Sequence, residues 1–181
     1  MEPHMKLETE RLILRAVEVD DAPDLFPIMN DPEVTATLLL PYPYPEERVI
    51  QWIVSAGEAH QHAERYEIAV VPKDVGRAVG VCSLYRVSWE HLSAELVYWI
   101  GKGYWGRGYM TEAARRVLQF GFVDLGLERI CIGCFTQNAA SRRVIEKLGF
   151  QYEGLARGEF KKGEERFDTL HFAILREEFE G

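Results

Sequence analysis

The stretch formed by residues 94–126 constrains the fold most, because it changes from a strand to a glycine-rich loop and then to a helix. Residues 96–100 are an apolar and aromatic run too short for a helix. Four glycines follow within residues 101–108, and from Tyr109 onward apolar side chains recur at helical spacing. Glycines let a backbone approach a ligand closely, while the first N–H groups of a helix lack acceptors and favour negative charge. The pattern therefore predicts a phosphate or pyrophosphate site.

Other interpretations of this loop are open at this point. GKGYWG, residues 101–106, matches the dinucleotide pattern G-x-G-x-x-G, which needs its last glycine at the helix start and an acidic residue after the next strand. Here Gly108 still precedes the helix, and the next strand leads into residues 136–138, Thr-Gln-Asn. A Walker loop is excluded because Lys102 is followed by glycine rather than Ser or Thr. A turn that binds nothing is the simplest alternative.

Residues 104–113, YWGRGYMTEA, resemble the acetyl-CoA pyrophosphate loop of the GNAT acetyltransferase superfamily, especially the branch that includes ribosomal-protein N-terminal acetyltransferases. The wider superfamily pattern is Gln/Arg-x-x-Gly-x-Gly/Ala, from which this chain departs at Trp105 and Met110. A backbone N–H points at phosphate whatever its side chain, so these departures leave the expected site intact. The resemblance extends from LETERLILR near the start to the closing strand.

A second resemblance lies in NAASRRVIEKLGF, residues 138–150, which is similar to the branch's Asn-x-x-Ser…Glu-Lys-x-Gly-Phe segment. In that branch the Asn and the Ser face the pantetheine arm and the thioester sulfur, which implies the same positions for Asn138 and Ser141. From the residues alone, Asn138 is a helix cap and Ser141 a first-turn hydroxyl. Both roles are compatible for Asn138, because its amide group has donors to spare.

The resemblance implies acetyl-CoA as the co-substrate, with no metal, and a binding site shared by a strand, the glycine-rich loop and a helix start. The residues that it assigns to the coenzyme are Val97, Tyr98, Trp99, Ile100, Trp105, Gly106, Arg107, Gly108, Tyr109, Met110, Thr111, Asn138, Ser141 and Arg143. Arg107 and Arg143 would give local positive charge for the phosphates, although each could equally be an ordinary solvated surface residue.

The chemistry implied is direct attack of an amine on the acetyl thioester, with three candidate catalytic residues. A carboxylate, acting directly or through water, would take the amine proton, and the candidates are Glu95 and Glu159, with a slight preference for Glu95. A backbone N–H of the central strand would polarise the carbonyl. Ser141 would protonate the departing thiolate, with Tyr98 and Tyr152 as hydroxyl alternatives. His171, in an apolar strand, is expected to belong to the core.

At 181 residues and 47% hydrophobic content, the chain is expected to form one GNAT-like domain over residues 1–181. The order of elements matches the GNAT arrangement, and the resemblance implies a mixed α/β domain: a mostly antiparallel sheet of about seven strands, splayed between strands 4 and 5, flanked by about four helices. Asp20 or Asp21 is expected to cap the first helix, and a second helix should begin near Pro45. The expected strands span 11–17, 66–72, 78–89, 96–100, 128–135, 150–160 and 166–176, with a loop at 31–45.

Charge and composition limit the partners. The net charge of −8 argues against nucleic acid and suits a cationic amine acceptor, although solubility alone also explains it. The chain shows no membrane-spanning run or signal peptide, which predicts a cytoplasmic protein. The cysteines Cys82, Cys131 and Cys134 are expected to be free thiols, with the last two on opposite faces of a strand.

Two functions from different classes fit these observations. One is an N-acetyltransferase for a protein N-terminal amine, such as that of a ribosomal protein, or for a small amine. The other is a non-catalytic acyl-CoA-binding sensor or pseudoenzyme. A homodimer is an open alternative to a monomer.

Overall fold

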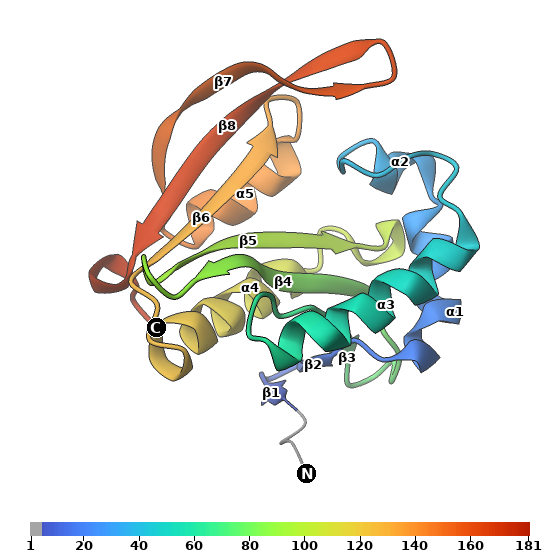
Figure 1. Ribbon diagram of the computed structural model, residues 1–181, viewed down its shortest axis with the longest axis horizontal. Coiled ribbons are helices and arrows are strands. Elements are labelled where there is room, and N and C mark those ends of the chain that lie inside the picture. Colours follow the sequence, from blue (N-terminus) through green and yellow to red (C-terminus); the bar gives the residue numbers. More distant parts are fainter. Residues whose placement is uncertain (1–4) are drawn as a thin grey trace.

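The computed structural model describes residues 5–181, so residues 1–4 of the expected domain lie outside the described part. One eight-stranded sheet runs through the chain in the order β1-β2-β3-β4-β5-β6-β8-β7 (Figure 1). Its strands are β1 Lys6–Glu8, β2 Leu12–Ala16, β3 Ile68–Pro72, β4 Gly80–Ser88, β5 Ser93–Ile100, β6 Arg129–Phe135, β7 Gln151–Lys162 and β8 Glu165–Leu175. All neighbours are antiparallel except β5 and β6, which confirms the expected mixed and mostly antiparallel sheet.

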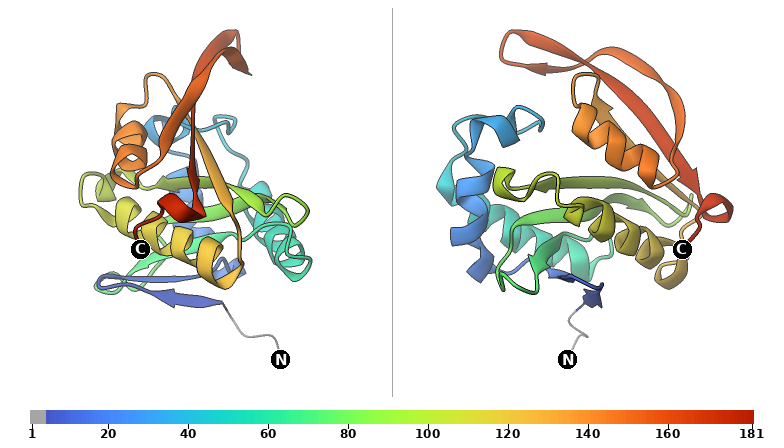
Figure 2. Two further views of the ribbon diagram at one scale, coloured as in Figure 1. Left: turned by 90° about the vertical axis from the view of Figure 1, so that its left-hand side faces the viewer. Right: turned by 180° about the vertical axis from the view of Figure 1, so that it is seen from behind.

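The helices cover both faces of this sheet. They are α1 Ala22–Met29, α2 Pro32–Thr35, α3 Glu46–Gln61, α4 Tyr109–Gln119, which continues as a π-helical turn over Phe120–Asp124, and α5 Ala139–Lys147. α4 lies on one face and α3 on the other, as Figure 2 shows. Each face buries its own apolar cluster, one built around α4 and one around α1 and α3. Within residues 5–181, no helix is both long and apolar enough to cross a membrane.

Alternation along β5 gives its two faces different neighbours. Ala94 and Leu96 are buried in the cluster under α4, and Tyr98 packs against that same cluster. Glu95, Val97 and Trp99 therefore point to the opposite face. There the Trp99 ring lies against Trp52 of α3, with 6.4 Å between the ring centroids. β5 thus presents different side chains to each side of the sheet.

The sheet opens between β5 and β6. These strands pair in parallel only from Ser93 to Glu95, opposite Arg129 to Cys131. Beyond Glu95, β5 continues beside β4 alone, while β6 continues beside β8 (Figure 1). The backbone edge of β5 that faces the opening therefore has no strand partner among residues 5–181. This confirms the predicted splay between the fourth and fifth expected strands.

Two local expectations were wrong. The segment 31–45, expected to be a loop, contains α2, because the Asp31 side chain accepts a hydrogen bond from the Glu33 N–H at 2.8 Å and so caps a short helix. Asp20 or Asp21 was expected to cap the first helix. Asp21 does stand at the N-cap of α1, but its carboxylate makes no capping hydrogen bond there and instead receives both terminal nitrogens of Arg15, each at 2.7 Å. Two parallel charge-assisted hydrogen bonds to a guanidinium hold the carboxylate in this position.

Candidate active site

The loop between β5 and α4 leaves a row of backbone donors free. Gly106 and Gly108 have φ of 72° and 79°, a left-handed conformation that favours glycine. The amides of residues 106–111 donate no hydrogen bond to any other part of residues 5–181. Several free N–H groups at the positive end of an eleven-residue helix suit a pyrophosphate. The residues present therefore fit the phosphates of a coenzyme A.

The side chains of this loop hold it in place rather than fill it. The Trp105 indole donates to the Ile100 carbonyl at 2.9 Å, which ties the loop to the end of β5. The Arg107 guanidinium lies over the Tyr104 ring, 5.5 Å from its centroid. Met110 is buried in the core under α4, and Tyr109 is buried beside it, so both offer the loop only their backbones. This burial explains why methionine is tolerated where the family pattern has Gly or Ala.

Asn138, Ser141 and Tyr98 come together across the opening between β5 and β6. The Asn138 side chain accepts a hydrogen bond from the Ser141 N–H at 3.0 Å, so its expected role as the cap of α5 is confirmed. The Ser141 hydroxyl lies 2.9 Å from the Tyr98 hydroxyl of β5. Burial raises the pKa of Tyr98 well above its usual value, so this phenol keeps its proton. The two hydroxyls therefore form a neutral hydrogen-bonded pair on the α4 side of the sheet.

The candidate carboxylates lie away from that hydroxyl pair. Glu95 points to the other face of β5 from Tyr98, and its Oε2 lies 3.4 Å from Nη1 of Arg86. Glu159 lies on β7, where its Oε2 is 2.9 Å from Nε2 of His171 on β8. The structure therefore brings Ser141 and Tyr98 together but places neither carboxylate in contact with them.

His171 is not a core residue, so that expectation was wrong. Its side chain is 42% exposed and paired with Glu159. The cause is its register partner in β6, Gly133, which has no side chain to cover the ring. Directly paired residues share a face of a sheet, so the pairs Glu95–Cys131 and Gly133–His171 put His171 on the same face as Glu95. Both candidate carboxylates are therefore accessible from one side, opposite the hydroxyl pair.

A cavity of about 670 Å³ lies where several elements meet beside this site. It is lined by α2 and the segment after it, by the end of β6, by the first turn of α5 including Asn138, and by the tip of the β7–β8 hairpin. Lys162, at that tip, donates to the carbonyls of Thr35 at 2.5 Å and Leu38 at 3.2 Å. The contact spans 127 residues of sequence, and no local pattern could have indicated it.

Other predicted residues are distributed as follows. Arg143 is exposed on α5, while its neighbour Arg142 pairs with Glu146 at 2.8 Å. Tyr152 is 58% exposed and packs against Phe172 rather than toward Ser141. Cys134 is buried, and Cys131 lies partly open on the other face of β6, as the strand spacing predicts. Within residues 5–181, no group of three or more His, Cys, Asp or Glu side chains is placed to hold a metal ion.

The comparisons with known proteins agree with this geometry. Residues 11–151 match the family model for the acetyltransferase (GNAT) domain. An uncharacterized N-acetyltransferase, p20 of Bacillus licheniformis, is 32% identical over 177 residues, covering 97% of this chain and 98% of p20. YdaF of Bacillus subtilis, whose name proposes a ribosomal N-acetyltransferase, is 34% identical over 106 residues, covering 59% of this chain and 58% of YdaF. A GNAT-family acetyltransferase structure from Bacillus anthracis is 28% identical, with a TM-score of 0.85 and coverage of 96% and 100%.

The chain therefore belongs to the GNAT acetyltransferase family. The class of enzyme expected from the resemblance, an acetyl-CoA-dependent acetyltransferase, is confirmed. The acceptor and the roles of individual residues stay predictions.

Proposed function

We propose that this enzyme transfers the acetyl group of acetyl-CoA to a primary amine, either the N-terminal amine of a protein such as a ribosomal protein or a small amine. The observation that carries the proposal is the opening between β5 and β6, which has a hydroxyl pair on one face of the sheet and carboxylates on the other. The name of YdaF supports a ribosomal acceptor. The net charge of −8 suits a cationic amine of either kind.

In this proposal the chain holds the coenzyme along one face of the sheet. The free amides of residues 106–111 would bind the pyrophosphate, with Arg107 and Arg143 adding positive charge. The unpaired edge of β5 over residues 97–100 would line the pantetheine arm, and Asn138 would flank it from α5. Acetyl-CoA, when bound, supplies a thioester whose carbonyl carbon accepts the amine.

Proton transfer would involve both faces. The acceptor ammonium must lose a proton before its nitrogen can attack, and a carboxylate is suited to take it. Glu95 and Glu159 are both candidates, and the structure adds His171 as the hydrogen-bonded partner of Glu159. The guanidinium beside Glu95 cannot accept a proton, whereas the imidazole beside Glu159 can, which favours the Glu159–His171 pair. On the other face, Ser141 would protonate the thiolate, and Tyr98 would stabilise its hydroxyl.

The direct test is a panel of acceptors. Ribosomal-protein N-terminal peptides and small amines, including polyamines, are incubated with acetyl-CoA, while thiol release and product mass are measured together. The same peptides with a blocked N-terminus are the matched control. We expect acetylation of free amines only, at an identified nitrogen. If acetyl-CoA binds by calorimetry but no amine is acetylated, the proposal is overturned in favour of a non-catalytic acyl-CoA sensor.

A further inference from the structure

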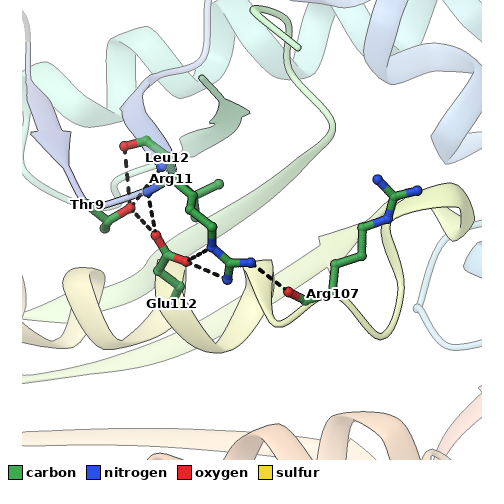
Figure 3. Close-up of polar contacts among 5 residues, drawn as sticks. All are labelled: Thr9, Arg11, Leu12, Arg107 and Glu112. Atoms are coloured by element: carbon green, nitrogen blue, oxygen red, sulfur yellow. Dashed lines mark hydrogen bonds and ion pairs between the residues drawn. The ribbon is translucent and has the colours of Figure 1, made fainter. Parts of the chain in front are cut away.

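A cluster of polar contacts ties the β1–β2 turn to the loop before α4. Figure 3 shows its members, Thr9, Arg11 and Glu112, together with the backbone of Arg107. One oxygen of Glu112 accepts from the Thr9 hydroxyl at 2.6 Å and from the Arg11 N–H at 2.9 Å. The other accepts from Nε of Arg11 at 2.7 Å and lies 2.6 Å from its Nη2. We call the paired Arg11 and Glu112 side chains the Arg11–Glu112 clamp.

Glu112 stands in the first turn of α4, beside the amides that would receive pyrophosphate. A free carboxylate there would compete with an anionic ligand for the positive end of the helix. The clamp draws both of its oxygens toward the β1–β2 turn. Burial raises the pKa of Glu112, but the hydrogen bonds from Thr9 and from the backbone and side chain of Arg11 outweigh it, so the net pKa is lowered. The carboxylate is therefore ionised and fully occupied at neutral pH.

Arg11 also sets the direction of one backbone donor. Its Nη1 donates to the Arg107 carbonyl at 3.0 Å. The C=O and N–H of a trans peptide point in opposite directions, so the Gly108 N–H is turned away from Arg11. The guanidinium lies over the Tyr109 ring at 4.8 Å, and a Cβ added at Gly108 would lie 3.4 Å from its Nη2. The side chain is thus packed against three consecutive residues of the loop.

We propose that Arg11 is a positioning residue for the coenzyme: it occupies Glu112 and orients the 107–108 peptide so that the loop amides face the pyrophosphate. The inference rests on the assignment of residues 105–111 to the pyrophosphate under the proposed function. It gives Thr9 and Arg11 of the β1–β2 turn a role beyond connecting the two strands. The competing explanation is that Arg11, whose side chain is 44% exposed, binds a phosphate directly.

Calorimetric titration with coenzyme A tests the clamp without an acceptor. Arg11→Met is expected to raise the Kd by about tenfold to a hundredfold, the range for losing hydrogen bonds to a charged group. Arg15→Met is the matched control, because it removes a bidentate pair from the neighbouring strand β2, with two contacts of 2.7 Å to Asp21. It should lower the midpoint of thermal unfolding and leave the Kd unchanged. An unchanged Kd in folded Arg11→Met overturns the proposal.

Glu112→Gln distinguishes a positioning role of Arg11 from direct binding of phosphate by Arg11, because the two predict opposite changes in the Kd for coenzyme A. Removing a negative charge beside an anion site relieves Coulomb repulsion, which by itself should tighten binding of coenzyme A. The clamp predicts weaker binding, because the guanidinium is released from its partner and no longer fixes the 107–108 peptide. The double variant with Arg11→Met should then be no weaker than Arg11→Met alone. Tighter binding in Glu112→Gln, or additive losses in the double variant, would show that Arg11 acts on the phosphate itself.

Gly108→Val distinguishes failure of the clamp from failure of the loop assignment. A valine there is strained at a φ of 79° and intrudes on the loop. If folded Gly108→Val binds coenzyme A as well as the wild type, the loop is not the pyrophosphate site and the inference falls with it. If Gly108→Val weakens binding and Arg11→Met does not, the loop assignment stands and the clamp alone is wrong.

Discussion

Tyr98 and Ser141 place two hydroxyls 2.9 Å apart at the opening of the sheet, one from a strand and one from a helix start. If Ser141 protonates the thiolate, its removal should affect the transition state more than the bound coenzyme. Ser141→Ala is therefore expected to lower the single-turnover rate by about tenfold to a thousandfold with little change in coenzyme affinity. Tyr98→Phe should give a smaller loss, and Tyr152→Phe, whose hydroxyl is exposed elsewhere, should give none. A collapse of affinity at an unchanged rate would make Ser141 a binding residue only.

The Glu159–His171 pair and Glu95 can be separated by the pH dependence of catalysis. An amine that is mostly protonated at neutral pH needs a base there, and needs it less as pH approaches the amine's own pKa, about 10.4 for a lysine-like group. Glu159→Gln should therefore depress the rate at neutral pH and recover partly as pH rises, while Glu95→Gln has the smaller effect. His171→Gln keeps a donor toward Glu159 but cannot titrate, so it separates orientation from proton transfer. The reverse pattern would assign the base to Glu95, and equal pH-independent losses would mean that both carboxylates bind the ammonium.

At the scale of residues, sequence reasoning worked where the signal was local. The cap at Asn138 and the position of Ser141 follow from a short pattern at a helix start. His171 was misplaced because alternation predicts a face of a strand, whereas its exposure depends on Gly133 in another strand. The Arg11–Glu112 contact joins residues 101 apart, so neither segment alone could indicate it.

Among the elements, the tip of the β7–β8 hairpin contacts α2 and the segment after it, beside the cavity that we expect to receive the acceptor. Lys162 donates to the carbonyl of Thr35 at the end of α2 and to that of Leu38 after it, and desolvation lowers the pKa of its ammonium. Lys162→Met should release this segment, speed amide hydrogen exchange over residues 35–40 and raise the KM for the acceptor, with coenzyme affinity unchanged. Lys161→Met is the matched control, since Lys161 is exposed and pairs only at 3.8 Å with Glu164. Unchanged exchange in Lys162→Met would show that the hairpin does not hold the segment.

The elements that could be predicted from sequence are those long enough to show a period. The strand, loop and helix over residues 94–126 and the strand at residues 128–135 appear where short apolar runs and helical spacing predicted them. β1 has three residues and α2 has four, too few for either period to be visible. β1 forms by pairing with β2, and α2 depends on the cap from Asp31, the residue directly before it.

At the scale of the whole molecule, the parallel pairing of β5 and β6 is short, with three register pairs before the strands separate. The loop, β5 and α4 lie on one side of this opening, and β6, α5 and the β7–β8 hairpin on the other (Figure 1). The sequence predicted that the sheet splays but could not set the register at which pairing stops, because that register depends on contacts far apart in the chain. A ligand held by both sides is expected to couple them.

Coenzyme A should therefore protect amides on both sides of the opening from hydrogen exchange. Ligand at about 100 times its Kd should stabilise the fold by about 2.7 kcal/mol, so the unfolding midpoint should rise with coenzyme concentration. If Asn138 and Ser141 flank the pantetheine arm as proposed, protection will include α5 as well as residues 105–111. Gly108→Val, which is expected to lose the pyrophosphate contact, provides the control and should show neither effect at the same concentration. Protection confined to the loop and α4 would contradict the proposed role of α5, because it would show that the coenzyme is held from one side alone.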